Sequence, residues 1–325
     1  MATAEQIKSL IKSHFSDQQE QFCTIALQLA AHEARQGHQS LANDIKTLVD
    51  QSATKRAKVI SFVPELDLYV LTSMPDVLFS EMVQPQEIRD RIQRILLEYR
   101  QRLKLEKHGL SPRRKILIAG PPGTGKTLTA SVLASELNLP LSTVLMDKVI
   151  TKFMGETSAK LRQIFDGIKI QRAVYFFDEF DAIGGERSSE NDVGEMRRVL
   201  NTFLQLLEED RSESLIVAAT NSPRMLDQAL FRRFDDVMYY HLPSDAEIQQ
   251  LIRNRLGCMI SDTFVMNDAI SAADSLSHAE IVQACDDAMK DCILSDNASV
   301  SSDLLIQMLK EKHDVYQGMK EQING

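Results

Sequence analysis

Residues 120–127 have the sequence GPPGTGKT, which fits the pattern GxxxxGK[ST] at every required position. The segment lies between an apolar, β-rich run at 115–119 and a helical pattern that begins at residue 126. In that context the glycines let the backbone curl, so that its N–H groups and the positive end of the following helix meet phosphate oxygens. The residues expected to bind ATP are Gly120, Pro121, Pro122, Gly123, Thr124, Gly125, Lys126, Thr127 and Leu128.

An acidic pair, Asp178 and Glu179, follows the buried strand predicted at 173–177. Parallel α/β sheets bind their ligands at the carboxyl ends of their strands, so the pair is expected near the phosphate loop. Lys126 is then predicted to reach the β and γ phosphates, while the Thr127 hydroxyl and Asp178 hold Mg²⁺. Glu179 is predicted to polarise the water that attacks the γ phosphate. An acidic pair alone would only indicate a solvated strand end, but the upstream phosphate loop favours this functional interpretation.

Strands and helices alternate from residue 86 to 243, which predicts an α/β P-loop sandwich, a parallel sheet between helices. Helical periodicity predicts an N-terminal helical bundle at 1–55 and a C-terminal all-helical lid domain at 244–325. Residues 56–85 contain three prolines and are interpreted as a linker with a short strand or two. The bundle is expected to be a packed core rather than a dedicated binding groove.

Composition argues against several other classes of protein. The net charge of −9, from 37 basic and 46 acidic residues, disfavours a general grip on nucleic acid, which stays a secondary hypothesis. The four cysteines form no CxxC pair, so we expect reduced thiols, no disulfide and no structural metal. Neither a signal sequence nor an apolar run of roughly 20 residues is present, so a cytoplasmic protein without a membrane span is expected.

Four motifs in this order resemble the AAA family of the AAA+ ATPases: the phosphate loop, the acidic pair, AATN at 218–221 and FRRFD at 231–235. The resemblance covers about Val77 to Cys292. It implies that Asn221 is the first sensor, which hydrogen-bonds the attacking water or the γ phosphate. Taken alone, Asn221 would be interpreted as a turn residue before Pro223.

The same resemblance implies that Arg232 and Arg233 are arginine fingers, which reach into the nucleotide site of a neighbouring subunit. A planar, permanently charged guanidinium suits the charge that spreads over the phosphoryl group during transfer. The alternative for either residue is a surface arginine that solvates a loop.

The segment KFMGE at 152–156 resembles the loop with which ring-shaped members grip an unfolded polypeptide in a central pore. Phe153, Met154 and Gly155 would form this loop, since an exposed aromatic side chain packs against any substrate without reading its sequence. The alternative is that Phe153 and Met154 are core residues at the start of a helix. A second pore loop is expected within 184–194.

Two departures from the family pattern concern nucleotide sensing and communication between subunits. His278 and Ala279 stand where many AAA+ relatives outside the AAA family carry an arginine, so sensing by the lid would depend on packing or on His278. His278 is also interpretable as a helix-capping or surface residue. The segment LLEEDRSES at 206–214 lacks the glycine-aromatic turn that many members use between subunits.

Two functions are compatible with these motifs. The first is a homo-oligomeric ring, a hexamer with ATP bound, that remodels or unfolds a protein partner. The second is an ATP-dependent switch that recruits or restrains a protein or DNA complex without threading, and it would tolerate Phe153→Ala but not Lys126→Ala. The domain layout also resembles small bacterial ATPases encoded beside a subtilisin-like protease. The chain has no HExxH motif, so any proteolysis would belong to a partner.

Overall fold

The computed structural model describes residues 29–30, 68–150, 154–181, 190–223 and 228–323. Contacts divide the chain into two compact units, Met1–Phe62 and Val63–Gly325. Of the first unit only Leu29 and Ala30 are described, and both are helical. The predicted N-terminal bundle and its boundary at residue 55 therefore lie outside the described residues, and the account below concerns the second unit.

A six-stranded sheet forms the centre of the described residues, with the strand order β1-β3-β4-β5-β2-β6. The strands are β1 (Val70–Ser73), β2 (Lys115–Ala119), β3 (Leu141–Val144), β4 (Val174–Phe177), β5 (Leu215–Thr220) and β6 (Asp236–Tyr239). All neighbouring pairs are parallel except β1 and β3, whose register aligns Val70 with Val144. Strands β4, β5 and β2 are therefore adjacent, and their carboxyl ends share one edge of the sheet.

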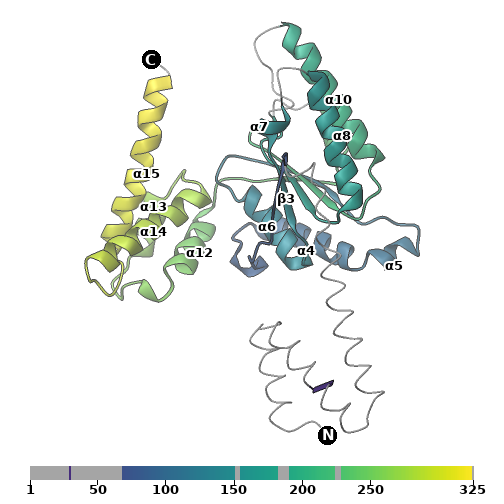
Figure 1. Ribbon diagram of the computed structural model, residues 1–325. Coiled ribbons are helices and arrows are strands. Elements are labelled where there is room, and N and C mark those ends of the chain that lie inside the picture. Colours follow the sequence, from purple (N-terminus) through teal and green to yellow (C-terminus); the bar gives the residue numbers. More distant parts are fainter. Residues whose placement is uncertain (1–28, 31–67, 151–153, 182–189, 224–227, 324–325) are drawn as a thin grey trace. The chain divides into compact units, whose positions relative to one another are not determined.

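The central strands are continuous apolar runs because both faces of the sheet are covered. Every residue of β2, β4 and β5 is buried, as expected for parallel strands between two helical layers. The helices α4 (Gln86–Arg100) and α6 (Lys126–Leu137) pack against one face, and α8 (Met154–Ile170) and α10 (Glu190–Glu209) against the other (Figure 1). This arrangement confirms the predicted α/β sandwich.

The C-terminal helices form a separate hydrophobic core. They are α12 (Asp245–Leu256), α13 (Met266–Ala272), α14 (His278–Leu294) and α15 (Ser302–Ile323). Ser244 and Ser277 precede α12 and α14 and form capping boxes. In each box the serine hydroxyl and the glutamate at the third position of the helix satisfy otherwise unpaired backbone N–H groups. Val83, which precedes α4 in the chain, also packs into this core.

Shorter elements connect these layers: η1 (Phe79–Glu81), α5 (Arg102–Glu106), α7 (Met146–Val149), α11 (Gln228–Phe231) and η3 (Gly257–Met259). No helix within the described ranges combines the length and the apolar composition that crossing a membrane requires.

The sheet differs from the sequence prediction in one respect, because it is mixed rather than wholly parallel. The segment interpreted as a linker, 56–85, contributes the antiparallel edge strand β1 and the buried side chains of Met82 and Val83. The apolar run around Val70 is short and ends before Pro75, so its pairing with β3 depends on contacts far away in the sequence. The other boundaries proposed from the sequence, at residues 85 and 243, stay predictions.

Candidate functional site

The loop between β2 and α6 follows a path that glycine makes possible. A Cβ atom on Gly120 would lie 2.4 Å from the carbonyl oxygen of Tyr240, closer than Cβ atoms in proteins come to non-bonded heavy atoms. Gly123 has a φ of +73°, and a Cβ atom there would lie 2.4 Å from the Ser277 hydroxyl. Both positions therefore exclude a side chain, and the loop stays thin and close to its neighbours, which suits the approach of backbone N–H groups to phosphate.

Lys126 is the first residue of α6, and its side chain is buried. Its Nζ donates to the carbonyl oxygens of Gly120 at 2.9 Å and of Pro121 at 2.7 Å, so the ammonium group lies inside the loop. Burial lowers the pKa of this ammonium, while the carboxylates of Asp178 and Asp181 act in the opposite direction and favour its charged form. The loop thus holds a cation at the start of a helix, where an anion is also stabilised by the helix dipole.

Thr127 and Asp178 lie next to each other although 50 residues separate them in the chain. The Thr127 hydroxyl donates to the Asp178 carboxylate at 3.3 Å, and both side chains are accessible to solvent. A hydroxyl and a carboxylate are hard oxygen ligands, and Mg²⁺ is commonly held by such groups together with substrate phosphates. The donor atoms at this position therefore fit the predicted magnesium site.

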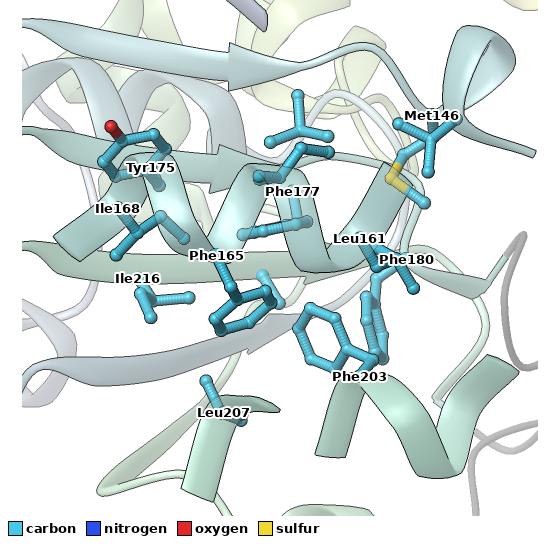
Figure 2. Close-up of a cluster of buried hydrophobic side chains, with 14 of the residues drawn as sticks. Met146, Leu161, Phe165, Ile168, Tyr175, Phe177, Phe180, Phe203, Leu207 and Ile216 are labelled. Atoms are coloured by element: carbon cyan, nitrogen blue, oxygen red, sulfur yellow. The ribbon is translucent and has the colours of Figure 1, made fainter. Parts of the chain in front are cut away.

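The acidic pair is held in place by two buried phenylalanines that flank it, Phe177 and Phe180. Both pack on Phe203 of α10, with ring centroids 5.2 and 4.6 Å apart, respectively (Figure 2). Asp178 and Glu179 between them are left facing solvent at the sheet edge. The hydrophobic core under the sheet thus fixes where the carboxylates emerge.

Glu179 has an unusual backbone conformation, with a φ of +50°. Its N–H donates to the Asp178 carboxylate at 2.9 Å, which supports this turn locally. A residue other than glycine in the left-handed region costs on the order of 1 kcal/mol, and such residues cluster at active sites. The strained turn therefore supports a functional role for Glu179 at this site.

Asn221 directly follows β5 and is exposed at the same sheet edge. Its backbone N–H donates to the Asp181 carboxylate at 3.4 Å, which links the ends of β4 and β5. The structure thus brings Lys126, Thr127, Asp178, Glu179 and Asn221 together around one cavity.

This cavity has a volume of about 470 Å³, a size typical of small-molecule sites. Polar side chains from the phosphate loop and the strand ends line it, together with apolar side chains from other elements. The apolar lining includes Val83 before α4, Leu251 of α12 and Val282 of α14. A molecule with one charged and one apolar part, such as a nucleotide, matches this lining.

Sequence reasoning missed the residues that attach the loop to the rest of the fold. The Gln84 side-chain amide donates to the Thr124 carbonyl at 2.7 Å, and the Ala279 N–H donates to the Gly123 carbonyl at 3.0 Å. A single glutamine before a proline carries no recognisable pattern. The family resemblance relates the start of α14 to nucleotide sensing, but no local pattern in the sequence predicts its contact with the loop.

Arg232 and Arg233 lie after α11, and both are exposed. Arg233 forms an ion pair with Glu208 of α10, and among the described residues that line the cavity neither arginine is found. The next residues anchor this turn: Phe234 is buried, and the Asp235 carboxylate accepts from the N–H groups of Arg114 and Lys115 at 2.8 and 2.9 Å. The arginines are therefore presented at the surface from a fixed base, away from the cavity of their own chain.

The predicted pore loop is described only in part. Phe153 lies outside the described residues, as does most of the second loop expected at 184–194. Met154 and Gly155 begin α8, and Gly155 is exposed with open space around it. The role of these residues in gripping a polypeptide stays a prediction.

Comparison with known proteins identifies one protein family and several relatives that this chain resembles. The family described as "ATPase family associated with various cellular activities (AAA)" matches residues 116–242. The uncharacterized AAA family ATPase y4kL of Sinorhizobium fredii is 33% identical over 90% of this chain and 90% of its own length. A proteasome-activating nucleotidase of Thermococcus onnurineus is 38% identical over 59% of this chain. The chain spans only 50% of that nucleotidase.

Proposed function

The chain belongs to the AAA family and is an ATP hydrolase, and from this premise we propose that it works as a homo-oligomeric ring that remodels or unfolds a protein partner. The observation that carries the proposal is the division of the predicted machinery between two places. Phosphate loop, acidic pair and Asn221 share one cavity, whereas Arg232 and Arg233 are exposed elsewhere on the surface. Arginines that serve hydrolysis from there must reach the cavity of another subunit.

In the proposed mechanism Lys126 and the N–H groups at the start of α6, including that of Leu128, hold the β and γ phosphates. Thr127 and Asp178 would hold Mg²⁺, which when bound would neutralise charge on the phosphate oxygens. Glu179 orients and polarises the attacking water, and the Asn221 amide fixes the position of the water or the γ phosphate. Lys126 is already held at the loop by two carbonyl oxygens, so little reorganisation is required of it.

The proposal extends to the arginines and the C-terminal helices. Arg232 and Arg233 stabilise the charge that develops on the γ phosphate in the neighbouring subunit. The helices α12 to α15 act as a lid, because residues of α12 and α14 line the cavity and the start of α14 bonds to Gly123. Movement of these helices during hydrolysis would change the position of the neighbouring subunit.

The proposed protein partner follows from the relatives of this chain. Relatives of this chain include proteasome-activating nucleotidases at 30–42% identity, whose name implies work on behalf of a protease. We propose that Phe153, Met154 and Gly155 contact the polypeptide. A separate protease of the subtilisin-like type is proposed to receive the unfolded polypeptide.

Glu179→Gln is expected to lower kcat for ATP roughly 10²–10⁴-fold while ATP binding is retained. The amide has nearly the shape of the carboxylate but cannot accept the proton of the attacking water, and Lys126 is untouched. Phosphate release measures turnover, and calorimetric titration measures ATP binding.

Glu209→Gln is the matched control, because Glu209 is an exposed glutamate of α10 that lies outside the residues lining the cavity. It should hydrolyse ATP like the unmodified protein. Turnover by Glu179→Gln within about two-fold of the unmodified rate would remove Glu179 from the mechanism.

A further inference from the structure

His278 is the first residue of α14 and lines the cavity together with Ala279 and Val282. It is 7% exposed, and among the described residues neither ring nitrogen has a hydrogen-bond partner. A buried polar group without a partner costs about 1–3 kcal/mol, so such groups call for an explanation. A polar partner supplied by a ligand in the cavity would remove this cost.

From this geometry we propose that His278 hydrogen-bonds the nucleoside part of the bound nucleotide and so contributes to the choice of nucleotide. This rests on the ATP site proposed above and assigns one residue within it. Both ring nitrogens are shielded from solvent. The proposed contact therefore requires the ring to turn toward the cavity when the nucleoside enters. A neutral imidazole carries one donor and one acceptor, which matches both the edge of a purine base and a ribose hydroxyl.

Two observations favour a contact of His278 with the nucleoside rather than with the γ phosphate. Leu251 and Val282, which also line the cavity, are apolar. The charged groups of the lining come from the phosphate loop, from a strand end and, in the case of Glu81, from η1. Burial lowers the pKa of the His278 imidazole, although the Glu247 carboxylate opposes this shift. The ring is therefore neutral near pH 7, and a neutral ring suits a base better than a phosphate trianion.

The test compares His278→Ala with the unmodified full-length chain by calorimetric titration in the presence of EDTA. The probes are ADP, inosine diphosphate, 2′-deoxy-ADP and pyrophosphate. We expect His278→Ala to bind ADP about ten-fold more weakly, the size of one hydrogen bond, and to bind pyrophosphate with unchanged affinity. His278→Gln, which keeps a donor and an acceptor, should recover part of the affinity for ADP.

The two analogues identify the atom that His278 contacts. The unmodified chain should discriminate against inosine diphosphate if the ring meets the base, or against 2′-deoxy-ADP if it meets the ribose. That discrimination should disappear in His278→Ala. His313→Ala is the matched control, because the His313 ring lies 3.2 Å from the Ala272 carbonyl and outside the cavity lining.

Two results would overturn the inference. Equal affinity of His278→Ala and the unmodified chain for ADP would make the residue structural, for example as a partner of Glu247, whose Oε1 is also buried and unpaired. An equal loss of affinity for ADP and pyrophosphate would show an effect on the phosphate loop instead. If the unmodified chain bound neither ligand, the ATP site itself would be refuted, which is a separate outcome.

Discussion

Lys126→Ala is expected to weaken ATP binding on the order of 100-fold or more and thereby to stop hydrolysis at millimolar ATP. The substitution removes the buried ammonium group that lies between the Gly120 and Pro121 carbonyl oxygens. Without it the loop presents only N–H groups to two or more negative charges. Calorimetric titration with ATP measures the binding loss, and phosphate release measures the loss of turnover.

Lys115→Ala is the matched control for this experiment. Lys115 is also a buried lysine whose pKa is lowered by burial, but it begins β2 at the end far from the loop and does not line the cavity. It should retain ATP affinity even where it unfolds at a lower temperature. Unchanged ATP affinity in a folded Lys126→Ala protein would contradict the assignment of the phosphate loop.

Arg233→Ala is expected to lower kcat roughly 10³-fold or more, with ATP affinity unchanged. The guanidinium is absent from the cavity of its own chain, so the loss would arise in the neighbouring subunit during phosphoryl transfer. The ion pair with Glu208 is exposed on both sides and contributes little to stability, so the variant should fold normally. Steady-state phosphate release and ATP titration together separate the two effects.

Mixing subunits shows whether the finger acts between chains. Arg233→Ala retains Glu179, and Glu179→Gln retains Arg233, so a mixed ring restores some complete sites only if the arginine acts on a neighbour. Arg94→Ala, another exposed arginine paired with a carboxylate, should behave like the unmodified protein. Mixtures without recovered activity, despite assembly, would contradict a finger supplied in trans.

Local patterns were sufficient to predict the chemical groups and their order. The glycine-rich segment between an apolar run and a helical run predicted the loop, and the helix Lys126–Leu137 begins at the predicted residue. The apolar runs of β4 and β5 end directly before Asp178 and Asn221, so adjacency of parallel strands brought those residues together. The position of Asp178 needed only periodicity and the geometry of a parallel sheet, whereas Asn221 was assigned by the resemblance to the family.

Contacts between distant segments could not be predicted in this way. The Gln84 amide binds the loop from 40 residues upstream, and Leu251 and Val282 come from helices beyond the sheet. The packing of Phe177 and Phe180 on Phe203 likewise fixes the acidic pair through a residue of another helix (Figure 2). Such contacts depend on how complete elements pack, which a single sequence does not encode locally.

The FRRFD segment contains both residues that were predicted from the sequence and a contact that was not. Its arginines were assigned by resemblance, and the structure places them on the surface. The role of Asp235, whose carboxylate accepts two backbone N–H groups at the start of β2, was not predicted because its partners lie 121 and 120 residues earlier. A motif thus identified the groups, while the fold shows what fixes their position.

The mass of the Glu179→Gln protein, measured by light scattering with and without ATP and Mg²⁺, tests the ring proposal most directly. The variant should hold ATP without consuming it, so that subunits whose arginines reach a neighbouring site accumulate as an assembly. A shift to a hexamer-sized species on addition of ATP and Mg²⁺, absent when Lys126→Ala is added to the same chain, is the predicted result. A protein that stays monomeric or dimeric with ATP bound would contradict the ring and favour the ATP-dependent switch.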